Sequence, residues 1–138
     1  YLYLKQLYDH SLINYKLETY IKNMSESLNW CHLIICRSGA GTIAENLIAG
    51  RPSIMIPLPN SSDNHQMKNA LMIEKLGAGH VIRNNDINDQ NKLILKLKSI
   101  IFNLEGLCMM SKSAKNNAIL GAEKQLINLG KEILNGKN

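Results

Sequence analysis

The stretch from Leu33 to Glu45 constrains the fold more than any other part of this chain. It begins with the apolar run Leu33–Cys36, which is too short for a helix and too apolar for a strand with one solvated face. Such a run is typical of a strand buried in a parallel sheet. The segment Ser38–Gly41 (SGAG) follows, and its small side chains predict a turn to which a ligand can come close.

A helix is expected directly after this turn. Thr42 is predicted to open the helix, and Glu45 completes a capping-box pattern with it. Backbone N–H groups at a helix N-terminus beside glycines suit a phosphate, and open α/β sheets bind ligands at the carboxyl ends of their strands. The pattern is neither G-x-G-x-x-G nor G-x-x-x-x-G-K-[ST]. By itself it therefore fits an ordinary strand-to-helix turn as well as a phosphate site.

The rest of the chain predicts strands that alternate with helices. Such an order is typical of βαβ units with a parallel sheet and right-handed crossovers. Met67 is expected in the core and Asn69 is expected to support its loop, while Gly77 is expected to end their helix. The predicted strands are 15–20, 33–36, 53–56 and 80–82. The predicted helices are 1–8, 24–30 with Asn23 as cap, one from Thr42, one from Asp63 or Asn64 to 76, one from 86–89 to a break at Gly106, and 109–134 with an interruption near Gly121.

Composition narrows the possible partners. The 138 residues suffice for one α/β domain. The sequence contains no run of about 18 apolar residues, which is the length a helix needs to span a membrane. The N-terminus has no secretory-signal pattern. The net charge of +5 comes mostly from scattered lysines, without an arginine cluster or an aromatic platform. Nucleic-acid binding is therefore not expected, whereas a weak attraction to an anionic membrane surface stays open.

The cysteines point to a reducing compartment. Cys31, Cys36 and Cys108 are odd in number, and two of them lie near the predicted buried strand. Neither C-x-x-C nor H-x-x-x-H spacing occurs. We therefore expect reduced thiols, no metal site and no cofactor.

Four segments in this order resemble the C-terminal domain of the bacterial MurG family. They are CRSGAGTIAE (36–45), AGRPSIMIPLP (49–59), DNHQMKNA (63–70) and EKLGAGHVI (74–82). The resemblance runs from about Ile21 to Ile82, with a weaker helical match toward the C-terminus. It implies an α/β fold with a Rossmann-like parallel sheet flanked by helices, the C-terminal half of a GT-B glycosyltransferase. Residues 1–138 are then one UDP-sugar-binding domain, truncated on its N-terminal side.

The resemblance also implies an activity. MurG-type enzymes transfer N-acetylglucosamine from its UDP donor to the undecaprenyl-linked muramyl-pentapeptide, converting lipid I to lipid II in peptidoglycan synthesis. They act as peripheral proteins on the cytoplasmic face of the bacterial inner membrane and serve cell-wall biogenesis, cell shape and cell division. The family's acceptor site and proposed catalytic base lie in the N-terminal domain. No catalytic residue is therefore expected in this chain, which alone is expected to be inactive.

The resemblance places a UDP-N-acetylglucosamine site on specific positions. The backbone of residues 40–42 and the Thr42 hydroxyl are expected at the diphosphate, although the family commonly has a bulkier residue at Gly41. Glu45 is expected at the ribose hydroxyls, with helix capping as the alternative. Ile21 lies against the uracil ring or in the core, and Gln66 contacts the donor sugar or is a solvated residue at a helix start. The complete set is Ile21, Ala40, Gly41, Thr42, Ile43, Ala44, Glu45 and Gln66.

Some roles and competing functions stay open. Arg37 approaches the diphosphate or acceptor, or forms a salt bridge, and His65 has no assigned role. The chain could be a non-catalytic donor-binding subunit that works with a separate membrane-anchored acceptor subunit. It could also be a UDP-sugar epimerase, although that family needs a pair of carboxylates across its cleft and only Glu45 is a candidate. An inactive gene fragment is a further alternative.

Overall fold

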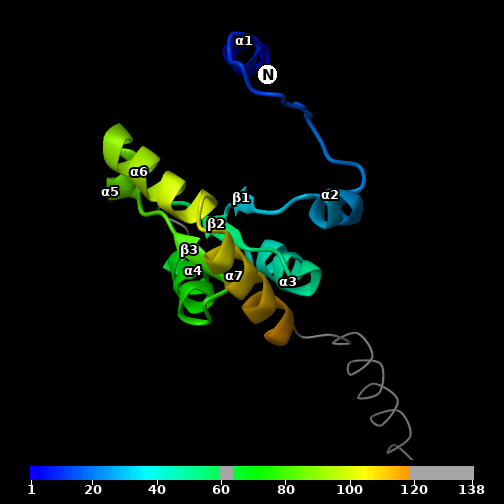
Figure 1. The fold of residues 1–138 in the computed structure, drawn as a ribbon, viewed down its shortest axis with the longest axis vertical. Helices are drawn as coiled ribbons and strands as arrows, with labels where there is room; N and C mark the ends of the chain where they lie inside the picture. The colour runs from blue at the N-terminus through cyan, green and yellow to red at the C-terminus, as the bar shows by residue number, and fades with distance from the viewer. Residues whose placement is uncertain (60–63, 119–138) are drawn as a thin grey trace, which may run out of the picture. The chain divides into compact units, whose positions relative to one another are not determined.

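The computed structural model describes residues 1–59 and 64–118. The chain divides into two units, residues Tyr1–Trp30 and residues from Cys31 onward (Figure 1). The first unit contains α1 (Leu2–Asp9) and α2 (Met24–Trp30), and no residue of either helix is buried. Both helices were predicted, and the Asn23 side chain accepts a hydrogen bond from the Glu26 N–H at 3.1 Å, as expected of a cap.

The predicted strand at residues 15–20 is wrong. The segment is irregular and pairs with no strand among the described residues. Its first residue, Tyr15, stacks on Tyr8 of α1 with ring centroids 4.9 Å apart, and its hydroxyl donates to Asp9. Alternating polarity shows that a segment has two faces, but a strand also needs a neighbouring backbone to accept and donate hydrogen bonds.

The second unit is built on a parallel sheet. Its strands are β1 (Ile34–Cys36), β2 (Ser53–Met55) and β3 (Gly79–Val81), in the order β1-β2-β3. Ile54 of the central strand lies between Ile35 and His80 in register. All of β2 is buried, as a central strand of a covered sheet should be. The parallel sheet and three of the four predicted strands are thus confirmed. The predicted burial of the strand at 33–36 is wrong, because β1 lies at an edge of the three described strands and its Ile35 is 54% exposed.

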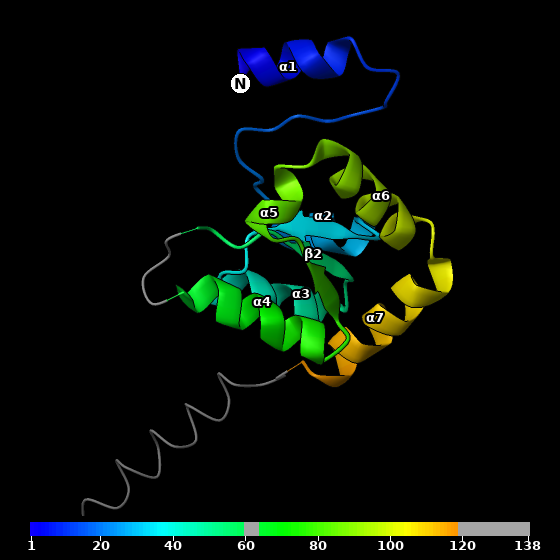
Figure 2. The same cartoon turned by 90° about the vertical axis from the view of Figure 1, so that its left-hand side faces the viewer.

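Helices cover both faces of this sheet (Figure 2). Helix α3 (Ala40–Ala49) joins β1 to β2, and α4 (His65–Lys75) lies between β2 and β3. Figure 2 shows these two helices below the sheet and α6 (Gln90–Ile101) above it. The lower layer buries Ile43, Met55, Ala70, Ile73, Ala78, Val81 and Ala114, and the partly buried Met67 packs against them, as predicted. The upper layer buries Ile54, Ile82, Ile100 and Met110.

Several helix boundaries differ from prediction because side-chain caps act locally. Asp89 caps α6 by accepting from the Lys92 N–H at 3.1 Å, so residues 84–87 form a separate short helix, α5 (Asn84–Ile87). Asn103 caps α7 (Leu104–Asn116) by accepting from the Gly106 N–H at 2.9 Å. Gly106 therefore lies inside the first turn of a helix that it was expected to interrupt. Asp63 and residues 119–138, including Gly121, lie outside the described residues.

Candidate functional site

The carboxyl ends of β1 and β2 lie at one edge of the sheet. Arg37–Gly39 lead from β1 into α3 at this edge, and the loop from Ile56 follows β2. The Ile56 N–H donates to the Cys36 carbonyl at 2.9 Å, so the two loops leave the sheet side by side. Ligands bind at this edge in open α/β sheets, and the glycine turn lies there as predicted.

Helix α3 begins earlier than expected. Its first residue is Ala40, and the extended residue Gly39 (φ −67°, ψ 147°) caps it without a side-chain hydrogen bond. The predicted capping box of Thr42 and Glu45 is therefore wrong, because both residues lie inside the helix. Since Gly39 already starts the helix, the Glu45 carboxylate has no capping role and lies exposed on the helix surface.

The first turn of α3 presents unpaired backbone donors. The first intrahelical bond runs from the Ile43 N–H to the Gly39 carbonyl at 3.0 Å, so the N–H groups of residues 40–42 have no acceptor within the helix. Ala40 and Gly41 are exposed and Thr42 is half-buried. A Cβ atom added at Gly41 would meet no atom within 4 Å. The positive end of the helix dipole is thus open to an anion.

Two neighbours of this turn differ in what they can offer a ligand. Ala44 is exposed on the surface of α3. Ile43 is only 6% exposed, and its side chain packs in the core beside Met55 and Ile73. Ile43 therefore offers little of its side-chain surface to a ligand.

Gln66 lies in the first turn of α4, next to the glycine turn. Its Oε1 accepts a hydrogen bond from the Leu58 N–H at 2.9 Å. Its backbone carbonyl accepts from the Ser38 hydroxyl at 2.8 Å. The structure thus brings Gln66 beside the residues that precede α3, and its side chain also holds the proline-containing loop after β2.

Ile21 belongs to the first unit, where its side chain is 43% exposed. Its contact with a uracil ring stays a prediction.

Arg37 and Asn69 fasten the same loops. Arg37 Nη1 donates to the carbonyl oxygens of Ile56 at 3.1 Å and Pro57 at 3.3 Å. Asn69 Nδ2 donates to the Ser38 carbonyl at 3.1 Å, which confirms the expectation that Asn69 supports the loop. Ser38 was not predicted as a site residue, because nothing about a small polar residue in the segment SGAG indicates that it is fully buried.

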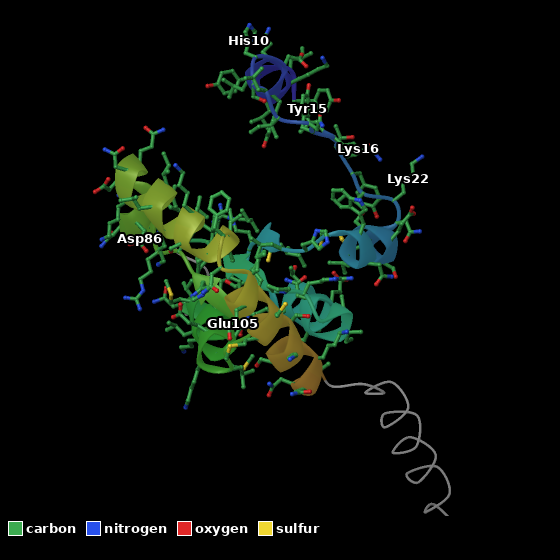
Figure 3. All side chains as sticks on the ribbon, in the orientation of Figure 1. His10, Tyr15, Lys16, Lys22, Asp86 and Glu105 are labelled. Carbon is green, nitrogen blue, oxygen red and sulfur yellow. The ribbon has the colours of Figure 1, made fainter. Side chains whose placement is uncertain are left out.

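Two titratable groups near the sheet edge have shifted pKa values. Burial raises the pKa of the Cys36 thiol, and the Asn46 amide that donates to its Sγ opposes this shift. The pKa of Asp86, labelled in Figure 3, is lowered by the Arg83 N–H and by Lys96. Lys96 Nζ lies 3.1 Å from Asp86 Oδ2 and donates to the Val81 carbonyl at 2.8 Å. This cluster fastens α5 and α6 to the carboxyl end of β3.

Across residues 1–59 and 64–118, no group of three or more His, Cys, Asp or Glu side chains is placed to hold a metal ion. No helix in the same ranges is long and apolar enough to cross a membrane.

Comparisons with known proteins identify the fold. Residues 3–126 match the family model of the glycosyltransferase family 28 C-terminal domain. Two curated relatives are both named UDP-N-acetylglucosamine–N-acetylmuramyl-(pentapeptide) pyrophosphoryl-undecaprenol N-acetylglucosamine transferase. The protein from Francisella tularensis subsp. tularensis (strain WY96-3418) is 38% identical over 121 residues, covering 88% of this chain and 32% of the relative. The protein from Ectopseudomonas mendocina (strain ymp) is 33% identical over 129 residues, covering 94% of this chain and 36% of the relative.

A solved structure agrees with these relatives. The crystal structure of Acinetobacter baumannii MurG superposes with a TM-score of 0.83 at 26% identity, covering 93% of this chain and 37% of that one. The chain thus spans about a third of the length of the curated relatives it matches. The predicted resemblance to the MurG C-terminal domain and the predicted Rossmann-like fold are both confirmed. The chain belongs to the glycosyltransferase family 28 C-terminal domain family.

Proposed function

We propose that this chain is the donor-binding domain of a transferase that moves N-acetylglucosamine from UDP-N-acetylglucosamine to the undecaprenyl-linked muramyl-pentapeptide of peptidoglycan synthesis. The observation that carries the proposal is the open first turn of α3 at the carboxyl edge of the sheet, with Gln66 beside it. The family of the domain and the names of its relatives support the same reaction.

The first turn of α3 suits a departing diphosphate. When the bond between the sugar and the β-phosphate breaks, negative charge grows on the UDP leaving group. The N–H groups of residues 40–42 and the helix dipole favour that charge without having to reorganise. The Thr42 hydroxyl can donate a further hydrogen bond to a phosphate oxygen.

Glu45 suits the ribose of the same nucleotide. Residues three apart lie on one face of a helix, so the Glu45 carboxylate follows Thr42 along the surface of α3. A carboxylate accepts hydrogen bonds from two neighbouring hydroxyl groups, as the ribose 2′ and 3′ positions present them. In this assignment Ile21 lies against the uracil ring, and the Gln66 amide contacts the hydroxyl groups of the sugar.

The remaining steps belong to parts of the relatives that this chain does not match. The acceptor site and the general base are assigned there, and the isolated chain is not expected to transfer sugar. The whole enzyme would associate peripherally with the cytoplasmic face of the bacterial inner membrane, where its lipid acceptor lies, and would serve cell shape and cell division. Nucleic acid is not among the proposed partners.

A transfer assay with labelled UDP-N-acetylglucosamine and the lipid acceptor tests the proposal. The chain would be joined to the N-terminal two-thirds of the Francisella relative, and the isolated chain would serve as the control. We expect product only from the joined protein, and much less product from its Glu45→Ala variant. A joined protein that is folded and binds UDP but transfers no sugar would contradict the proposed reaction.

A further inference from the structure

Ser38 is a buried polar residue at the candidate site to which no ligand contact is assigned. Its side chain is 0% exposed, so it cannot meet a ligand. Its hydroxyl donates to the backbone carbonyl of Gln66 at 2.8 Å, across 28 residues of sequence. Ser38 also lies directly before Gly39, the cap of α3. It therefore links the two segments that would hold the two ends of the donor.

A second hydrogen bond on the same residue strengthens this link. Asn69, one turn after Gln66 on α4, donates to the Ser38 carbonyl at 3.1 Å. The hydroxyl and the carbonyl of Ser38 thus both tie the start of α3 to the start of α4. Hydrogen bonds at a buried position are costly to break, because the group left behind finds no water. The spacing between the two helix starts is therefore firmly set.

The Gln66 side chain is fixed from the other side. Its Oε1 accepts from the Leu58 N–H at 2.9 Å, so the backbone of Gln66 is held by Ser38 and its side chain by the loop after β2. A site that holds two groups at a fixed separation favours a ligand whose two ends match that separation. The two ends here are the diphosphate, at residues 40–42, and the sugar, at Gln66.

We propose that Ser38 is a positioning residue that sets the distance between residues 40–42, which would hold the diphosphate, and Gln66. It thereby sets how much more tightly the domain binds UDP-N-acetylglucosamine than UDP. The inference rests on the proposed function, because both ends of the donor are assigned there. Ser38 acts only through Gln66 and touches neither the diphosphate nor the sugar.

The test compares the Kd of UDP with the Kd of UDP-N-acetylglucosamine by calorimetry on the 138-residue chain. We expect Ser38→Ala to leave the Kd of UDP within about twofold and to weaken UDP-N-acetylglucosamine roughly fivefold, which is the size of one lost hydrogen bond. Asn69→Ala removes the other bond and is expected to shift the ratio of the two Kd values in the same direction. If Ser38→Ala fails to fold, Asn69→Ala decides the question.

Ser111→Ala is the matched control. The Ser111 hydroxyl donates to the Gly50 carbonyl at 2.7 Å, so the variant removes the same kind of bond at the opposite end of α3. It is expected to lower the thermal stability without changing the ratio of the Kd values. In a Gln66→Ala background, Ser38→Ala should not raise the Kd of UDP-N-acetylglucosamine any further relative to that of UDP. If Ser38 had only a general structural role, Ser38→Ala would have the same effect on the two Kd values with and without Gln66.

The outcomes separate this inference from the proposed function. A wild-type chain that binds both ligands, with an unchanged ratio in Ser38→Ala and Asn69→Ala, would overturn the role of Ser38 alone. A wild-type chain that binds neither ligand would overturn the donor site, and the role of Ser38 with it.

Discussion

Replacing Gly41 by alanine should stabilise the chain. Gly41 is the second residue of α3, and a Cβ atom there would meet nothing within 4 Å. Glycine is about 1 kcal/mol less favourable than alanine inside a helix, because it loses more backbone freedom on folding. Since Gly41 lies in the first turn, we expect Gly41→Ala to raise the free energy of unfolding by about 0.5–1 kcal/mol. Thermal unfolding followed by circular dichroism should show a Tm higher by about 2–5 °C.

Gly79→Ala is the matched control with the opposite sign. Gly79 starts β3, and a Cβ atom there would lie 2.4 Å from the backbone oxygen of Ser53 on β2. That contact is too short for the paired strands to keep their spacing. We expect the free energy of unfolding to fall by about 1–3 kcal/mol, the usual cost of overpacking. The same chemical change should therefore move the Tm in opposite directions at the two positions.

The same Gly41→Ala variant tests how the turn binds its ligand. Alanine keeps the backbone N–H, so the Kd of UDP should stay within about twofold of the wild-type value if residues 40–42 bind through their backbone. A lower Tm would refute the open geometry around Gly41. A loss of UDP affinity of about tenfold or more, corresponding to roughly 1.4 kcal/mol, would refute binding through the backbone alone.

Three further predictions follow from single contacts. In the joined protein, Gln66→Ala should lower kcat/KM for UDP-N-acetylglucosamine by a factor that corresponds to about 1–3 kcal/mol, and it should weaken UDP binding much less. An equal loss in both would mean that the change acts through the loop at Leu58. The pKa of Asp86 is lower in the folded chain than its unfolded value of about 3.9, so its contribution to stability is present above about pH 4 and is lost as the pH falls through the folded pKa. Asp86→Asn should accordingly flatten the acid limb of the stability curve below about pH 4, and an unchanged limb in an acid titration would contradict this. Because burial raises the pKa of Cys36 while Cys108 is exposed, iodoacetamide at neutral pH should modify Cys108 first, and equal rates by peptide mass spectrometry would count against this.

Local patterns predicted the positions of the strands well, because each strand is a short run between helices that contains apolar residues. The runs around β1, β2 and β3 each carry enough apolar side chains to indicate a covered parallel sheet. The segment 15–20 has an equally regular pattern but pairs with no described strand, because strand formation depends on a partner and not on the segment alone.

Helix starts were predicted less well, because several residue types compete to cap a helix. The pattern of Thr42 and Glu45 suggested a capping box, yet the extended Gly39 is the cap, and α3 begins at Ala40, two residues before Thr42. Asn103 caps α7 in the same local way, and the glycine that follows it looked like a break. A cap depends on backbone conformation as well as residue type, and the sequence shows only the latter.

The arrangement of the site could be predicted in part. The resemblance placed the backbone of residues 40–42 and Gln66 in one ligand site, and the structure places them at one edge of the sheet. The Ser38 contacts could not be predicted, because Gln66 and Asn69 lie far from Ser38 in the sequence. Only the fold brings α4 next to the start of α3. The second role of Gln66, as a support for Leu58, depends on the same loop.

Calorimetric titration of the chain with UDP, UMP and ADP tests the uridine diphosphate site most directly. We expect UDP to bind more tightly than UMP, because UMP lacks the second phosphate that the first turn of α3 would hold. We also expect UDP to bind more tightly than ADP, and Glu45→Ala to weaken UDP through the lost ribose contact. Equal affinity for ADP and UDP would contradict the assignment of this edge of the sheet to a uridine nucleotide, and no effect of Glu45→Ala would contradict the ribose contact.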